Sequence, residues 1–165
     1  MSQGQRGFTL MEMALVLVVI GLILGAVSLG RGVQRNAVYQ NITSDFVQGW
    51  VIAYDSYYTG NNHPPGDDPS NPSAKVNNAK DSELCGTDLK DTFLAAGIQL
   101  PQGRAEGAEN LFVYQDVNGN PHQLEVCFVN ADWHEPGNSS GDYVLRERNQ
   151  LILKGVVPSL ARYVD

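Results

Sequence analysis

The first 63 residues contain no proline, and the stretch from Met13 to Leu29 contains no charged residue. Without proline, nothing in this region interrupts a helix. Without charges, the stretch is apolar enough to lie in a bilayer. Together with residues 8–11 it is long enough to cross one at about 1.5 Å per residue. We therefore expect a membrane-spanning helix near the start of the chain.

Basic residues are scarce. The 165 residues include 11 Lys and Arg against 18 Asp and Glu, which gives a formal charge of −7. An acidic chain is a poor partner for phosphates, so we expect no nucleic-acid binding. Catalytic signatures are also missing, because no G-x-S-x-G, P-loop or dinucleotide fingerprint occurs. We expect one soluble domain beside the apolar segment, no enzyme activity and no cofactor.

Cysteine is limited to Cys85 and Cys127, both after the apolar segment. Outside the cytoplasm such a pair indicates one disulfide, whereas in the cytoplasm two free thiols are the default. We favour the disulfide. It would close a loop of about 42 residues, which corresponds to about 4 kcal/mol in the chain-entropy model.

Glu12 is the one ionisable residue inside the apolar segment. A carboxylate at membrane depth costs about 2–3 kcal/mol, so it marks a functional site and needs a partner. The segment contains no Lys, Arg or His, so we expect the partner to come from elsewhere. No small-residue cleavage site follows the apolar run, so we expect the run to be retained in the mature protein.

A helical stripe continues beyond the apolar segment. Its members recur at spacings of three and four and comprise Val38, Ile42, Phe46, Gly49, Ala53 and Tyr57. The sequence therefore predicts one helix over residues 8–58, apolar at first and amphipathic after about Arg31. Trp50, Tyr54, Tyr57 and Tyr58 are expected to pack in the core or on a polar-tipped helix surface.

Shorter elements follow the helix. Four prolines predict a loop over residues 59–80. A second helix is expected over residues 87–96, capped by Thr87 and ended by Gly97. Pro158 begins a terminal helical turn that ends at Tyr163.

Alternating apolar residues predict strands over residues 111–115 and 123–130, joined by a hairpin turn at Asn118-Gly119. We expect a polar loop over residues 131–142 and a third strand over residues 143–148. Residues 151–153 fit either a strand or a helix. The fold class is thus α+β, with the long helix packed on a small antiparallel sheet of three or four strands.

Gly7 is followed by Phe8-Thr9-Leu10-Met11-Glu12 and an unbroken apolar helix. This pattern resembles the leader signature of type IV pilins and type II secretion pseudopilins. The resemblance implies a type IV pilin-like fold with a leader peptide at residues 1–7, a transmembrane and assembly helix at 8–30, and a globular domain at 31–165. It also implies that a prepilin peptidase/methyltransferase cuts between Gly7 and Phe8 and methylates Phe8.

The resemblance gives Glu12 a role in subunit assembly. Its carboxylate would pair with the α-amino group of Phe8 on a neighbouring subunit, because a paired charge is tolerated where a lone one is not. The implied partners are membrane lipid before assembly, the inner-membrane assembly platform, and copies of itself or other pilins in a filament. The implied location is the inner membrane, with a periplasmic globular domain, and then the pilus or pseudopilus.

Gly21 and Gly25 form a G-x-x-x-G pair that indicates close helix packing or a soft point in the helix, with the ordinary glycine frequency of membrane helices as an equal alternative. Major pilins usually carry a proline near the position of Leu29. Its absence makes the chain resemble a minor pilin or pseudopilin-like subunit.

Calcium is a weak possibility at two acidic sites, Asp67 with Asp68 and Asp116 with Asn118. A hairpin and a solvated loop are the simpler interpretations. The three histidines lack the spacing of a zinc pair, so no metal site is predicted. The stretch from Tyr54 to Asp68, with its Pro65-Gly66-Asp67 loop, is similar to a loop in many uncharacterised prepilin-like proteins, and the resemblance implies no role for it.

Two classes of function fit these observations. The first is a filament subunit that polymerises through its N-terminal helix. The second is a periplasmic binding domain or enzyme that uses the helix only as a tether. A tether needs neither Gly7 nor Glu12, so these two residues discriminate between the classes.

Overall fold

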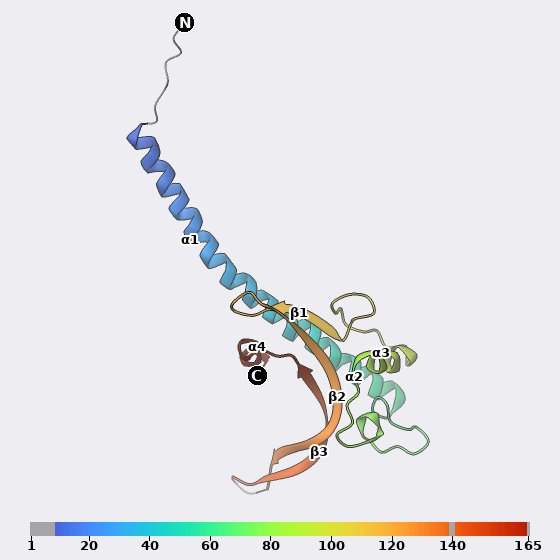
Figure 1. Ribbon diagram of the computed structural model, residues 1–165. Coiled ribbons are helices and arrows are strands. Elements are labelled where there is room, and N and C mark those ends of the chain that lie inside the picture. Colours follow the sequence, from blue (N-terminus) through green and yellow to red (C-terminus); the bar gives the residue numbers. More distant parts are fainter. Residues whose placement is uncertain (1–8, 139–140, 165) are drawn as a thin grey trace. The chain divides into compact units, whose positions relative to one another are not determined.

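The computed structural model describes residues 9–138 and 141–164. Contacts divide the chain into two compact units, residues 1–37 and 38–165, and each is described by itself. The described part of the first unit consists of helix α1 (Leu10–Asn41), which runs on into the second unit (Figure 1). Among the described residues, no helix meets the combined length and hydropathy of a membrane span.

Helical structure continues directly after α1, through the π-helical segment η1 (Ile42–Val47) and α2 (Gln48–Asn61). The predicted helix is confirmed, with an end at Asn61 where Asn62 takes a left-handed conformation. The π-helical segment was not predicted. Within it, the hydroxyls of Thr43 and Ser44 donate to carbonyl oxygens one turn back, and such bonds compete with the regular helical ladder.

The sheet is antiparallel, with the order β1-β2-β3. The strands are β1 (Leu111–Gln115), β2 (Pro121–Pro136) and β3 (Tyr143–Lys154). The hairpin at Asn118-Gly119 is confirmed, because Gly119 has the positive φ of 86° that such a turn requires, and the N–H of Asp116 donates to the carbonyl of Asn120.

The predicted polar loop at 131–142 is wrong, because β2 continues to Pro136. Residues 143–148 and 151–153 belong to one strand. The error has a physical cause: polar side chains occupy both faces of this part of the hairpin, while backbone pairing with β3 continues to Pro136 opposite Tyr143. Cross-strand ion pairs between Glu135 and the arginines of β3 accompany that pairing.

In the described part of the second unit, three short helices follow: η2 (Val76–Asn78), α3 (Gly86–Ala95) and α4 (Pro158–Val164). The predicted second and terminal helices are confirmed. The N-cap position of α3 is Cys85, so the expected cap at Thr87 is wrong, and no side chain caps this helix. Gly97 follows the helix end, and its N–H donates to the carbonyl of Leu94.

The core lies between α2, α3 and the sheet. Trp50 is fully buried on α2, and its ring meets Phe93 of α3 and Phe128 of β2 edge-on at 5.6 and 6.3 Å. Gly49, beside it, lets the chain pass close to the helix, because a Cβ atom there would lie 2.6 Å from the Cβ of Pro101. The predicted stripe residues Ile42, Phe46, Ala53 and Tyr57 are all buried.

The α+β prediction is therefore confirmed, with the N-terminal helix packed on a three-stranded antiparallel sheet.

Candidate functional site

The first described residues form a closed hydrogen-bonded motif at the start of α1. The backbone N–H of Thr9 donates to Glu12 Oε2 over 2.8 Å, and the hydroxyl of Thr9 lies 3.0 Å from the same oxygen. The N–H of Glu12 in turn lies 3.2 Å from the Thr9 hydroxyl. This is a capping box, in which Thr and Glu three residues apart satisfy each other's backbone donors. The Thr-x-x-Glu spacing is visible in the sequence, although this role was not predicted for Thr9.

Glu12 therefore caps its own helix while its carboxylate stays accessible to another molecule. Its carboxylate is exposed, and it stabilises the first turn of its own helix. The bonds to Thr9 involve Oε2, and no described residue forms an ion pair with the carboxylate. The motif is compatible with a cationic partner that approaches from another molecule.

Apart from Glu12, the described side chains from Leu10 to Leu24 are apolar and exposed. Leu10 is 93% exposed and Leu24 is 64% exposed. Gly21 and Gly25 have open space where a Cβ would stand, so their predicted role in helix packing stays a prediction. The predicted cleavage site, Gly7 and Phe8, lies outside the described residues.

The two cysteines are joined. The disulfide Cys85–Cys127 connects the residue before α3 to the middle strand of the sheet, with the Cα atoms 4.5 Å apart. Glu83 reaches the same place and forms an ion pair with Lys154. Glu83 and the two sulfur atoms converge as metal ligands would, but a metal takes a thiolate and both sulfur atoms are already bonded to each other.

Asp67 organises the loop that follows α2. Its carboxylate is buried and accepts hydrogen bonds from Asp68, Ala74 and both the N–H and the hydroxyl of Ser73. Burial alone would raise the pKa of Asp67, but these hydrogen bonds outweigh it and lower the pKa below its ordinary value. This gives the Pro65-Gly66-Asp67 loop a structural role that the sequence did not assign.

Asp68 is exposed and accepts from the N–H of Ser70, over 2.8 Å. Asp116 holds the β1–β2 turn, where its Oδ1 accepts the N–H groups of Asn118 and Asn120. Its Oδ2 lies 3.2 Å from His122 Nε2. The side chain of Asn120 is the largest cause of the lowered pKa of Asp116. The weak calcium candidates therefore use their oxygen atoms to fold the loops in which they lie.

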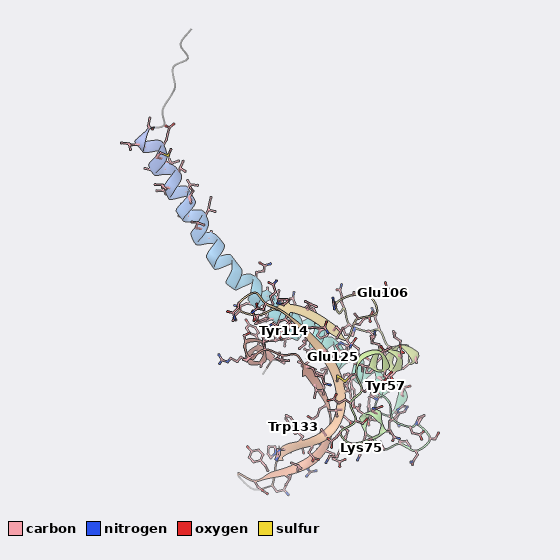
Figure 2. All side chains as sticks on the ribbon, viewed as in Figure 1. Tyr57, Lys75, Glu106, Tyr114, Glu125 and Trp133 are labelled. Carbon is pink, nitrogen blue, oxygen red and sulfur yellow. A yellow bond between two sulfur atoms is a disulfide. The ribbon has the colours of Figure 1, made fainter. Side chains whose placement is uncertain are left out.

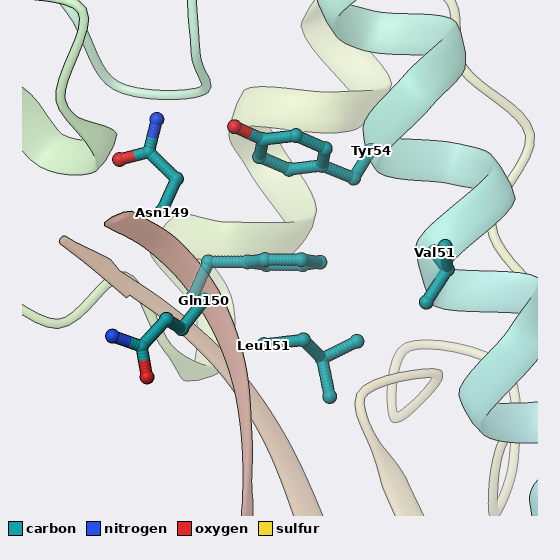
Figure 3. Close-up of a pocket in the computed structure, with 6 residues that line it drawn as sticks. Val51, Tyr54, Asn149, Gln150 and Leu151 are labelled. Carbon is teal, nitrogen blue, oxygen red and sulfur yellow. The ribbon is translucent and has the colours of Figure 1, made fainter. Parts of the chain in front are cut away.

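A pocket of about 160 Å³ opens between α2 and β3 (Figure 3). The stacked rings of Tyr54 and Phe128, 5.2 Å apart, line it together with Val51 and Leu151. Asn149 at its rim is already engaged, because its side chain bonds Val76, Asn130 and Ala74. The pocket is mainly apolar and of the size of one side chain.

Two tyrosines hold the C-terminal segment in place. The hydroxyl of Tyr114 donates to the carbonyl of Gly155 over 2.8 Å and accepts the N–H of Val157. The hydroxyl of Tyr39 lies 3.1 Å from Ser159 Oγ. Neither contact could be predicted, because a tyrosine in a helix or strand carries no local signal of its distant hydrogen-bond partner.

Comparison with known families identifies the N-terminal segment. Residues 2–28 match the family model of the prokaryotic N-terminal methylation motif. Comparison with curated proteins and with solved structures gave no match.

The chain thus carries the leader signature of type IV pilins and pseudopilins. Proteins with this motif are structural rather than enzymatic. The motif implies processing by a prepilin peptidase and assembly with other pilins, and it suggests a membrane-anchored or pilus-associated protein.

Proposed function

We propose that this chain is a structural subunit of a type IV pilus or type II secretion pseudopilus, of the minor-pilin or pseudopilin-like kind. It is cut between Gly7 and Phe8, methylated on Phe8, and polymerises through its N-terminal helix. The observation that carries this proposal is the match of residues 2–28 to the methylation motif.

The surface of α1 supports the proposal. Large apolar side chains from Leu10 to Leu24 are between 45% and 93% exposed. Each costs about 1.5–3 kcal/mol when left in water rather than buried. Lipid of the inner membrane would cover this surface before assembly, and the helices of neighbouring subunits would cover it afterwards. The inner-membrane assembly platform would move the subunit from one environment to the other.

Glu12 makes transfer from the membrane to the filament favourable. In lipid its carboxylate lacks a counter-charge within the apolar segment. In a filament the α-amino group of Phe8 on a neighbouring subunit supplies one, and a paired buried charge is far less costly than a lone one. Assembly is favoured by this difference.

The test combines the intact mass of the mature protein with the incorporation of variants into filaments. The intact mass of the mature protein should show the loss of residues 1–7 and the gain of one methyl group. Glu12→Leu should leave the protein in the membrane and remove it from the filament fraction, whereas the control Met13→Leu should enter filaments normally. An uncut chain, or filament entry by Glu12→Leu at the wild-type level, would instead favour a tethered periplasmic domain.

A further inference from the structure

The distal part of the β2–β3 hairpin forms an arm, which we define as residues 131–136 and 143–148. Within the arm, β2 pairs with β3 alone, because β1 pairs only with residues 121–125. Side chains of the arm alternate between two faces. Trp133 and Arg146 lie opposite each other on one face, with Glu135 and Arg148. Figure 2 shows Trp133 on this distal segment of β2.

The two faces of the arm differ in their contacts. On the face away from Trp133, Asp132 and Glu147 form ion pairs with Lys80 and Lys75 over 2.7 Å, so the chain itself occupies that side. On the Trp133 face, Glu135 pairs with Arg148 and lies 3.4 Å from Arg146. Two guanidinium groups then share one carboxylate. This face carries a net positive charge beside an aromatic ring that is 56% exposed.

A surface of opposite character lies on α3. Leu89 and Phe93 face the core and are fully buried, which leaves Asp88, Asp91 and Leu94 on the outer face. Leu94 is 56% exposed. Among residues 9–138 and 141–164, neither aspartate carboxylate forms an ion pair. This row therefore presents two free negative charges followed by an apolar side chain.

We propose that the Trp133 face of the arm on one copy of this chain docks on the Asp88-Asp91-Leu94 face of α3 on the next copy. The inference rests on the proposed function and names a contact between globular domains in the filament.

The spacings agree. Residues three apart on a helix lie about 5–6 Å apart, and alternate residues on a strand lie about 6.6 Å apart. The guanidinium groups of Arg146 and Arg148 meet at Glu135 and form one basic spot, and Trp133 lies opposite Arg146 on the neighbouring strand. This spot can face Asp88 and Asp91 while the indole contacts Leu94. Trp and Arg are also the residues that most often dominate binding energy at interfaces.

The geometry suits a filament because the two surfaces are different. A contact between unlike surfaces of identical subunits is heterologous, so each copy can bind one neighbour on each side, and such contacts generate open helical assemblies. The chain as a whole has a charge of −7, so its copies repel at long range. A local basic face offsets that repulsion and selects the surface on which the copies meet.

The test is a charge swap in the full chain, expressed in cells that assemble the filament. Arg146→Glu and Asp91→Arg should each lower the fraction of the protein in filaments about tenfold. The combination of both should restore that fraction to within about threefold of wild type. The controls Arg162→Glu and Asp55→Arg make the same charge changes at exposed positions of α4 and α2 and should leave incorporation unchanged.

A second measurement locates the contact directly. A photoreactive benzoyl-phenylalanine at position 133 should cross-link to α3 of another copy, as mapped by mass spectrometry. Wild-type incorporation of both single variants overturns the inference, as does a double variant that fails to recover, or a cross-link to another region or protein. If the unaltered chain never enters filaments, the proposed function fails. If the unaltered chain enters filaments and the Arg146→Glu and Asp91→Arg variants are incorporated equally well, only this inference fails.

Discussion

The backbone N–H of Thr9 donates to Glu12 Oε2 over 2.8 Å, so the one carboxylate of the apolar segment is also the cap of its own helix. Substitution by glutamine separates the two roles, because Gln serves equally in a capping box but has no charge. We expect Glu12→Gln to keep the helix start and lose filament incorporation.

Glu12→Ala removes both roles, because alanine has neither the charge nor an acceptor for the Thr9 N–H. Filament incorporation and amide hydrogen exchange of the first helical turn, both measured on the full chain, separate the effects. Incorporation of Glu12→Gln at the wild-type level would mean that the cap, and not the charge, is what the filament requires.

Asp67 offers a second prediction. Asp67→Asn replaces one acceptor oxygen by an NH₂ group that faces N–H donors of Ser73, Ala74 or Asp68. We expect a loss of about 2 kcal/mol of unfolding free energy, because buried donors are left without acceptors. Asp68→Asn, at an exposed neighbour, should change stability by about 0.5 kcal/mol or less. Urea unfolding of the detergent-solubilised chain, followed by tryptophan fluorescence, measures both unfolding free energies. Equal effects of the two substitutions would contradict the stabilising role of the Asp67 hydrogen bonds in the loop.

The long helix and its buried stripe could be predicted because their signal is local and periodic. Phe46 and Ala53 occur where the helical period places them, and both are buried. The arm could not be predicted in the same way. The sequence predicts a strand for its β3 side, residues 143–148, but not for its β2 side. Trp133 and Glu135 lie on β2 through backbone pairing with β3, whereas their polar neighbours resemble a loop in sequence.

The roles of single polar residues depended on partners far along the chain. The hydroxyl of Tyr114 forms hydrogen bonds with Gly155 and Val157, more than forty residues away, and no spacing in the sequence predicts them. Thr9 is different, because the Thr-x-x-Glu spacing was available and indicates a capping box. Its role was not predicted, because the charge of Glu12 in lipid was the only property considered for this pair.

Asp116 predicts a pH dependence of stability. Hydrogen bonds, first of all from the side chain of Asn120, lower the pKa of Asp116 below its ordinary value of 3.8 in the folded chain. A carboxyl with a lowered folded pKa contributes stability that is fully present above its unfolded pKa and is lost as the pH falls through the folded value. The urea midpoints of wild type and Asp116→Asn should therefore differ at pH 6, and the difference should begin to shrink as the pH falls below about 3.8 and keep shrinking toward the lower folded pKa. A difference that stays constant down to pH 2 would contradict this assignment.

The disulfide gives the last prediction. Cys85 and Cys127 are 42 residues apart, so the cross-link restricts a long loop of the unfolded chain and should be worth about 4 kcal/mol. Reduction of the wild-type protein should lower the unfolding free energy by about that amount and make the amides of residues 80–95 exchange faster. The variant Cys85→Ser/Cys127→Ala should match the reduced protein and show no response to reductant. If the reduced protein keeps its unfolding free energy, the cross-link does not hold α3 to the sheet, and the buried contacts of Leu89 and Phe93 do so alone.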